Sequence, residues 1–220
     1  MVVEKPVNML TQSDITGDYD LLSLLKNDLK IRYQKPGNVY LGLVHRLDRP
    51  VGGVMVFAKT SKAASRLSAQ MREGNLEKNY LAVIHGLLES KNGRLHDYLV
   101  KDRCRNMVTV VPSTTPGAKE AWLDYWVLEE REGLSLIRIA LGTGRSHQIR
   151  VQFATIGHPL YGDRKYGVST NRTGQQLALY SCRLRLQHPV SKEQLEFNSA
   201  PPSTYPWTTF QKFFNSGAQV

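Results

Sequence analysis

The sequence predicts an α+β fold with a mixed, largely antiparallel central sheet and a few flanking helices. Short apolar runs of strand character outnumber the amphipathic helical segments, and the helices do not alternate regularly with the strands. The chain has 220 residues, 41% of them hydrophobic, and no linker rich in Pro, Gly or Ser divides it. Because this length allows a sizeable core, we expect a single domain over residues 1–220.

Three segments have the periodicity and boundary residues of helices. In residues 21–31, Asp20 is placed to cap a helix whose one face carries Leu21, Leu25 and Leu29. A second helix follows Thr60 and ends before Gly74, with apolar residues four apart at Ala63, Leu67 and Met71. Residues 146–156 predict a third helix, which a glycine and a proline terminate.

The remaining apolar runs are short and rich in β-branched and aromatic residues, which favours strands. They predict strands over residues 54–58, 80–84, 107–111, 121–128, 134–141 and 177–186. Residues 112–118, with the sequence PSTTPGA, are the best candidate for a loop.

The formal net charge of +10 and the sequence pI near 9.7 point to a polyanionic partner such as nucleic acid. The alternative is a basic protein without such a partner. No apolar run is long enough to predict a membrane span, and no secretory signal is visible, so we expect a cytoplasmic protein without a membrane partner. Cys104 and Cys182 lie far apart in sequence and indicate ordinary thiols.

The densest cluster of polar residues is the segment VHRLDRPVGG at residues 44–53. It surrounds Asp48 with His45, Arg46 and Arg49, and nearby cations favour an ionised carboxylate. Such a carboxylate is a candidate nucleophile or general base. The simpler alternative is a loop aspartate paired with an arginine. The two glycines that follow allow close approach of backbone or ligand.

A second cluster, LGTGRSHQIR at residues 141–150, lies between a predicted strand and a predicted helix. It is not a dinucleotide fingerprint, because His147 stands where that motif needs its third glycine. It fits an anion-facing helix start better, with Arg145 beside free backbone N–H groups. Tyr161 and Tyr166 lie among the basic residues that follow, as suits a nucleic-acid surface. A solvated basic face is the alternative.

Tyr80 opens a predicted strand, where a tyrosine is more often part of the core than a stacking or proton-transfer group. The histidines and cysteines show no metal-ligand spacing, and neither a nucleophile elbow nor a Walker-type loop is present. The motifs therefore predict neither a metal site nor a nucleotide cofactor.

Together and in this order, these segments resemble the RluA family of pseudouridine synthases. The similarity runs over nearly the whole chain, and the ordered set is far more specific than any single motif. The matching segments are residues 2–6, 9–10, 45–48, 54–59, 78–86, 143–150, 157–160 and 161–163.

This resemblance implies the pseudouridine synthase fold, an RNA-binding cleft across its sheet, and no cofactor. It identifies Asp48 with the essential aspartate of the family, Tyr80 with its active-site tyrosine, and Arg145 with the basic residue that pairs with the aspartate. It further implies a stand-alone catalytic domain, without the small N-terminal RNA-binding domain of many relatives.

Two departures from the family pattern affect the predicted site. Pro50, Val51 and Gly52 occupy places where the family usually has Thr-Ser-Gly, so two hydroxyl groups are lost beside the predicted catalytic aspartate. Leu179, Tyr180 and Ser181 stand where the family often has Leu-His-Ala, so this strand lacks the family's histidine.

The expected activity is isomerisation of specific uridines in structured ribosomal or transfer RNA to pseudouridine, by a monomer. Two rivals are a catalytically silent RNA-binding or RNA-folding factor on the same scaffold, and a glycosidic hydrolase, which usually needs a second carboxylate. The residues expected to contact RNA are basic or polar: His45, Arg46, Arg49, His147, Gln148, Arg150, Arg164 and Lys165. Among them, Arg46 is a candidate for filling the gap that a flipped-out base leaves.

Overall fold

The computed structural model describes residues 1–215, which divide into two compact units. The first unit contains residues 1–78 and 181–200, and the second contains residues 79–180 and the described residues from 201 onward. Neither unit is a continuous stretch of sequence. The expectation of a single domain over residues 1–220 stays a prediction.

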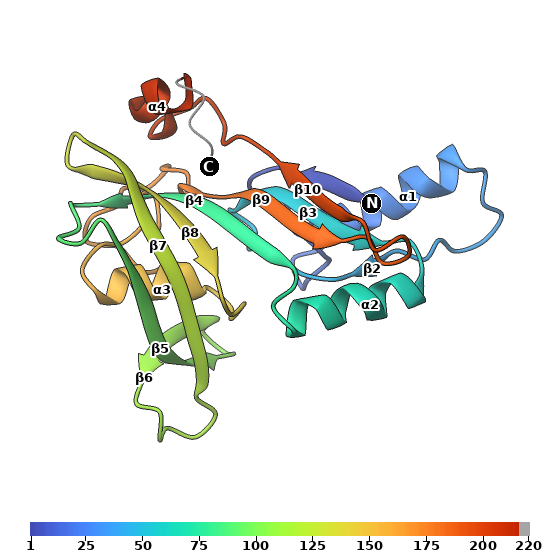
Figure 1. Cartoon of the computed structure of the whole chain (residues 1–220), viewed down its shortest axis with the longest axis horizontal. Coiled ribbons are helices and arrows are strands. Elements are labelled where there is room, and N and C mark those ends of the chain that lie inside the picture. The colour runs from blue at the N-terminus through green and yellow to red at the C-terminus, as the bar shows by residue number, and fades with distance from the viewer. Residues whose placement is uncertain (216–220) are drawn as a thin grey trace. The chain divides into compact units, whose positions relative to one another are not determined.

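The first unit is built on antiparallel strand pairs (Figure 1). Strands β1 and β2 both pair with β3, and β10 pairs with β9. Its elements are β1 (Val2–Lys5), α1 (Leu21–Arg32), β2 (Gly42–Leu43), β3 (Gly52–Ala58), α2 (Ser61–Arg72), most of β9 (Leu179–Gln187) and β10 (Gln194–Asn198). Side chains from β3, α2 and β9 form its core, with Val54, Val56, Leu67 and Leu184 buried together.

The two helices of this unit begin where the sequence predicts. The Asp20 side chain accepts a hydrogen bond from the backbone N–H of Ser23, and the Thr60 side chain accepts one from the N–H of Ala63. Each cap satisfies a backbone donor that the first helical turn leaves without an intrahelical partner. The predicted caps of α1 and α2 are therefore confirmed.

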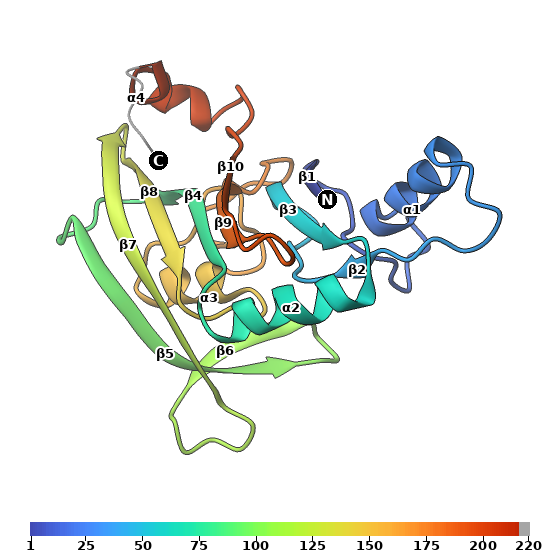
Figure 2. The same ribbon diagram turned by 45° about the vertical axis from the view of Figure 1, so that its right-hand side comes forward.

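The second unit is an antiparallel sheet with strand order β4-β8-β7-β5-β6. Its strands are β4 (Glu77–His85), β5 (Asn92–Asp102), β6 (Met107–Val111), β7 (Lys119–Arg131) and β8 (Leu134–Leu141). Figure 2 shows β5 and β7 as long curved strands. Helix α3 (Gln148–Thr155) packs on one face of this sheet, with Phe153 edge-on to Tyr125 at 5.7 Å between ring centroids.

The predicted α+β class with a largely antiparallel sheet is confirmed, although several elements were not anticipated. These are β2, β5, β10, the 3₁₀ turn Trp207–Phe210 and α4 (Gln211–Asn215), whereas β1 coincides with the opening strand that the family resemblance implies at residues 2–6. The first part of β5 alternates exposed polar residues, among them Arg94 and His96, with half-buried ones, so it lacks the long apolar run that indicated the other strands. Helix α3 begins two residues later than predicted, because His147 has a left-handed backbone with φ of 51°. Within residues 1–215, no helix has the length and apolar character needed to cross a membrane.

Candidate active site

Asp48 lies in the turn that leads into β3, and its neighbours alternate between the interior and solvent. His45 and Leu47 are buried, Arg46 is exposed, and Asp48 itself is half-buried. The turn closes through a hydrogen bond of 3.0 Å from the Val51 N–H to the Asp48 carbonyl. Asp48 therefore lies near the surface of the first unit, between the buried side chains of Leu47 and Val51.

Thr11 holds the residue before Asp48 from both directions. Its hydroxyl donates to the Leu47 carbonyl at 2.8 Å, and the same oxygen accepts from the Leu47 N–H at 3.3 Å. Sequence reasoning missed Thr11, because the bond joins residues 36 positions apart and no local pattern marks it.

Lys5 is fully buried and binds the other end of the Asp48 turn. Its ammonium donates to the carbonyl oxygens of Pro6, Met9 and Arg49, at 2.9, 2.6 and 3.1 Å. Burial lowers the pKa of Lys5 from 10.5 to about 8, and the attraction of Asp48 opposes that shift. Lys5 thus places a cation near Asp48 and fixes the backbone immediately after it, at Arg49. The sequence signal for Lys5 was its place in residues 2–6, the first segment of the family resemblance.

His45 supports β3 from within the protein. Its Nε2 accepts a hydrogen bond of 3.1 Å from the Val56 N–H, which requires a neutral ring with that nitrogen unprotonated. Burial, assisted by the charge of Lys78, lowers the pKa of His45 to about 3. The burial and the neutral ring argue against the predicted contact between His45 and RNA.

The predicted close approach at the glycine pair is present at Gly53. Its φ is +116°, and a Cβ there would lie 2.2 Å from the Ser181 carbonyl oxygen. Ser181, one of the departures from the family pattern, is buried and donates to the Val54 carbonyl at 3.0 Å. Val51, the other notable departure, is also buried. Both substitutions therefore lie in the packing around β3.

Tyr80 lies on β4 in the second unit and is directly opposite Ile139 of β8, which is in turn opposite Tyr125 of β7. Directly opposed residues in an antiparallel sheet share a face, so Tyr80 lies on the face that α3 covers. Only 6% of its surface is exposed. This burial is compatible with a tyrosine of the core. It is also compatible with an active-site tyrosine that contacts a flipped-out base.

Gln148 organises the loop that carries Arg145. The Gln148 side-chain oxygen accepts from the Arg145 N–H at 3.0 Å and from the Thr143 hydroxyl at 2.8 Å, and its amide donates to the Trp122 carbonyl at 3.0 Å. Arg145 is exposed, and its Nε donates to the Glu120 carbonyl at 2.8 Å. Gln148 is buried, so its position does not support the predicted contact with RNA.

Arg150 is committed to a buried ion pair with Asp163. The Arg150 Nε and Nη2 donate to the two carboxylate oxygens at 2.7 and 2.8 Å, and the side chains are only 7% and 0% exposed. The Asp163 carboxylate also accepts from the backbone N–H groups of Lys165 and Tyr166. This position argues against the prediction that Arg150 grips a phosphate, because the guanidinium closes the 161–167 turn onto α3 instead.

The remaining predicted RNA contacts are more accessible. Arg46 and Arg164 are exposed, and Lys165 reaches the Asn106 carbonyl at 2.9 Å. Arg49 is exposed and forms an ion pair of 2.7 Å with Asp18. His147 is half-buried, with its Nδ1 2.7 Å from the Tyr166 hydroxyl.

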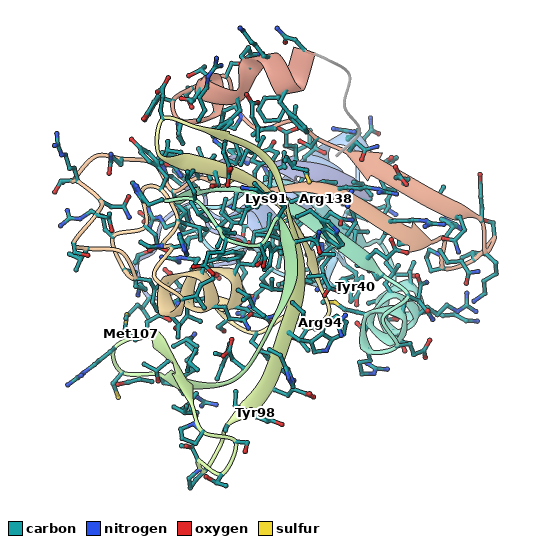
Figure 3. The ribbon with its side chains drawn as sticks, turned by 60° about the vertical axis from the view of Figure 1, so that its left-hand side comes forward. Tyr40, Lys91, Arg94, Tyr98, Met107 and Arg138 are labelled. Carbon is teal, nitrogen blue, oxygen red and sulfur yellow. The ribbon has the colours of Figure 1, made fainter. Side chains whose placement is uncertain are left out.

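The strands of the second unit carry two arginine–tryptophan stacks that the sequence analysis missed. Arg94 lies 4.4 Å from the Trp122 ring centroid, and Arg138 lies 4.5 Å from that of Trp126. Figure 3 shows these arginines along β5 and β8, with Lys91 and Tyr98 on the same unit. Arg94 also pairs with Asp124, so its charge is balanced within the sheet.

The structure therefore places Asp48 in the first unit and Tyr80 and Arg145 in the second. Their cooperation stays a prediction. Among the described residues, no three His, Cys, Asp or Glu side chains gather as a set of metal ligands.

The chain is similar to proteins of one family over most of its length. The sequence model of the RNA pseudouridylate synthase family matches residues 1–155. An uncharacterized RNA pseudouridine synthase of Aquifex aeolicus is 34% identical over 93% of this chain and 67% of its own. The ribosomal large subunit pseudouridine synthase C of Vibrio parahaemolyticus is 34% identical over 77% of this chain and 54% of its own.

The solved structure of human RNA pseudouridylate synthase domain containing 4 has the same fold. It superposes with a TM-score of 0.79 at 20% identity and covers 97% of this chain and 89% of that one. The fold and the ordered motifs thus define a pseudouridine synthase scaffold. The chain belongs to the RNA pseudouridylate synthase family, as the resemblance to RluA-type enzymes predicted. It spans between one half and about two thirds of the length of the two bacterial relatives.

Proposed function

We propose that this protein converts specific uridines of structured RNA to pseudouridine, with Asp48 as the essential carboxylate. The observation that carries the proposal is the Asp48 turn. It lies in the family's motif, and buried Lys5 and Thr11 hold the backbone on both sides of it. Two long-range anchors on one partly buried turn indicate that the position of its carboxylate matters.

The reaction needs no second substrate, because uridine and pseudouridine are isomers. The bond between N1 of uracil and C1′ of ribose breaks, the base turns, and C5 forms a new bond to C1′. C5 loses its proton, and N1 gains one. A base within a helix has to be flipped out first, at a cost of a few kcal/mol. The pocket must therefore retain the free uracil until the new bond forms.

Asp48 acts either as a nucleophile toward ribose or base, or as the base that removes a ribose proton. Arg145 keeps the carboxylate ionised and oriented, and Tyr80 stacks on the uracil or mediates a proton transfer. Lys5 adds a cation near Asp48 and binds the carbonyl of the residue that follows it.

The RNA is held by exposed basic groups at Arg46, Arg49 and Arg164 and by the half-buried Lys165, which contact phosphates. The name of the Vibrio parahaemolyticus relative favours ribosomal RNA over transfer RNA. We place the enzyme in the cytoplasm, as a monomer that needs no cofactor.

The decisive experiment is to replace Asp48 with Asn and map pseudouridine by base-specific chemical tagging. The RNA is taken from cells without the gene, before and after treatment with purified protein. We expect wild type to produce one or a few discrete signals. The Asp48→Asn variant should produce none, while its affinity for RNA stays within about tenfold of wild type.

Asp28→Asn is the matched control, because Asp28 forms only an exposed ion pair with Arg32 on α1. It should convert RNA as wild type does. Turnover by Asp48→Asn close to that of wild type would refute the assignment of the carboxylate.

A catalytically silent RNA-binding factor is the second candidate, favoured by the loss of two hydroxyls at Pro50 and Val51. The same experiment separates the two, since tight RNA binding by wild type without any product would support the silent factor. Release of free uracil would instead identify a hydrolase.

A further inference from the structure

A pocket of about 340 Å³ lies in the first unit, apart from every residue assigned above to the active site. It is formed by the end of α1, the loop of residues 33–41 and the residue that follows β3. Its volume lies at the lower end of the range found for small-molecule sites. Leu29 contributes an apolar side chain to it.

Two tyrosines and two lysines dominate the lining. Tyr33 and Tyr40 are about half exposed, and Lys35 and Lys59 bring positive charge. The Lys59 ammonium lies 4.9 Å from the centroid of the Tyr33 ring, so a cation already sits against an aromatic face. None of the described lining residues carries a carboxylate.

One side of the Tyr40 ring packs against the backbone of β2. A Cβ at Gly42 would lie 2.8 Å from the Tyr40 hydroxyl oxygen and 3.3 Å from its Cε1, so the ring packs directly on this glycine. The same Cβ would lie 3.0 Å from that of Ala64 on α2, and Figure 3 shows Tyr40 beside that helix. A ring held in this way loses little conformational entropy when a ligand stacks on it.

These groups match the parts of a nucleotide. Tyrosine rings offer faces on which any base stacks, lysine ammoniums pair with phosphate, and the amide of Asn38 has both donors and an acceptor for a base edge. An acidic peptide would use the lysines but would leave both ring faces and the amide without a role.

We propose that this pocket binds one nucleotide of a single-stranded segment of the RNA, outside the uridine that is isomerised. The proposal rests on RNA being the partner, as proposed above. The pocket extends the recognised RNA beyond the reacting nucleotide.

The test is fluorescence anisotropy with a 5′-labelled octamer of uridine and an abasic octamer of equal charge. Wild type should bind the uridine octamer more tightly than the abasic one. Tyr33→Ala should weaken binding of the uridine octamer at least about fivefold, as expected for loss of one stacked base, whereas Tyr33→Phe should bind as wild type. Lys59→Gln should weaken both octamers.

Lys62→Gln is the matched control, since Lys62 is an exposed lysine on α2 that does not line the pocket. Its affinity should stay within about twofold of wild type. The proposal is overturned if Tyr33→Ala binds within the same twofold, or if wild type does not distinguish the two octamers. It is also overturned if free uridine monophosphate binds as tightly as the octamer, because the ligand is then a mononucleotide.

Photo-crosslinking of an octamer containing 4-thiouridine gives a second readout on the wild-type protein, which avoids any folding defect of the variants. The crosslinked peptide should include residues 33–40, and a crosslink only elsewhere refutes the proposal. These measurements do not depend on catalysis. An inactive wild-type protein that still crosslinks at residues 33–40 would refute the isomerase and keep the pocket.

Discussion

Lys5 is a buried cation that binds the candidate catalytic turn. Its ammonium has three carbonyl partners, one of them on Arg49, immediately after Asp48. Because a buried ammonium is costly, the folded protein releases the Lys5 proton more readily than the unfolded chain does. The folded-state pKa of about 8 compares with 10.5 for the free side chain.

The pH dependence of stability follows from these two pKa values. Below pH 8, both states hold the proton and stability does not change on account of Lys5. Between pH 8 and pH 10.5, the unfolded chain binds more protons than the folded one, so the free energy of unfolding gains a term that rises with pH. The free energy of unfolding of wild type minus that of Lys5→Met should therefore increase from pH 7 to pH 9.5. Urea denaturation at each pH measures both values. A difference that is flat over this range would contradict the low pKa.

The Arg150–Asp163 pair shows that a basic residue in a motif need not face the ligand. Both side chains are almost completely buried, so removing one partner leaves a buried charge without compensation. Arg150→Leu should lower the free energy of unfolding by about 3–5 kcal/mol in a urea titration. Arg32→Leu, which removes an exposed pair with Asp28, should cost no more than about 0.5 kcal/mol. Equal effects of the two replacements would contradict the structural role of Arg150.

At the scale of elements, β3 and β9 approach each other closely at Gly53. Any other residue there would require the backbone of one strand to move. A Cβ at Gly53 would lie within 3 Å of three backbone atoms of Ser181, and the φ of +116° is unfavourable for any L side chain. The contact joins the strand that follows Asp48 to a strand far along the chain.

Gly53→Ala should lower the free energy of unfolding by about 3 kcal/mol or more, because backbone strain and a backbone clash add. Thermal denaturation measures the loss. Gly37→Ala is the matched control, since a Cβ there meets nothing within 4 Å, and it should be nearly neutral. A neutral effect of Gly53→Ala would mean that β3 and β9 do not approach this closely.

For the whole molecule, the net charge of +10 predicts RNA binding that depends strongly on salt. If Arg46, Arg49, Arg164 and Lys165 each contact one phosphate, the slope of log K against log[KCl] should be about −3 for single-stranded RNA. Filter binding between 50 and 300 mM KCl, on the order of physiological ionic strength, measures it. Neutralising all four residues should flatten the slope, and a flat response of wild type would refute the basic RNA surface.

The sequence by itself determined the α+β class, the capped helices α1 and α2, most of the strands and the family. The class, the caps and the strands follow from local signals, since an N-cap at Asp20 or Thr60 and an apolar run such as residues 134–141 act over a few residues. The family follows from the order of several motifs along the chain. Only the tertiary structure decided which polar side chains of the motifs face inward. His45, Gln148 and Arg150 are buried because their partners, the Val56 N–H, the Trp122 carbonyl and Asp163, come from other segments of the chain. Thr11 and the tyrosine pocket were missed for the same reason, because burial and concavity depend on long-range packing rather than on neighbouring sequence.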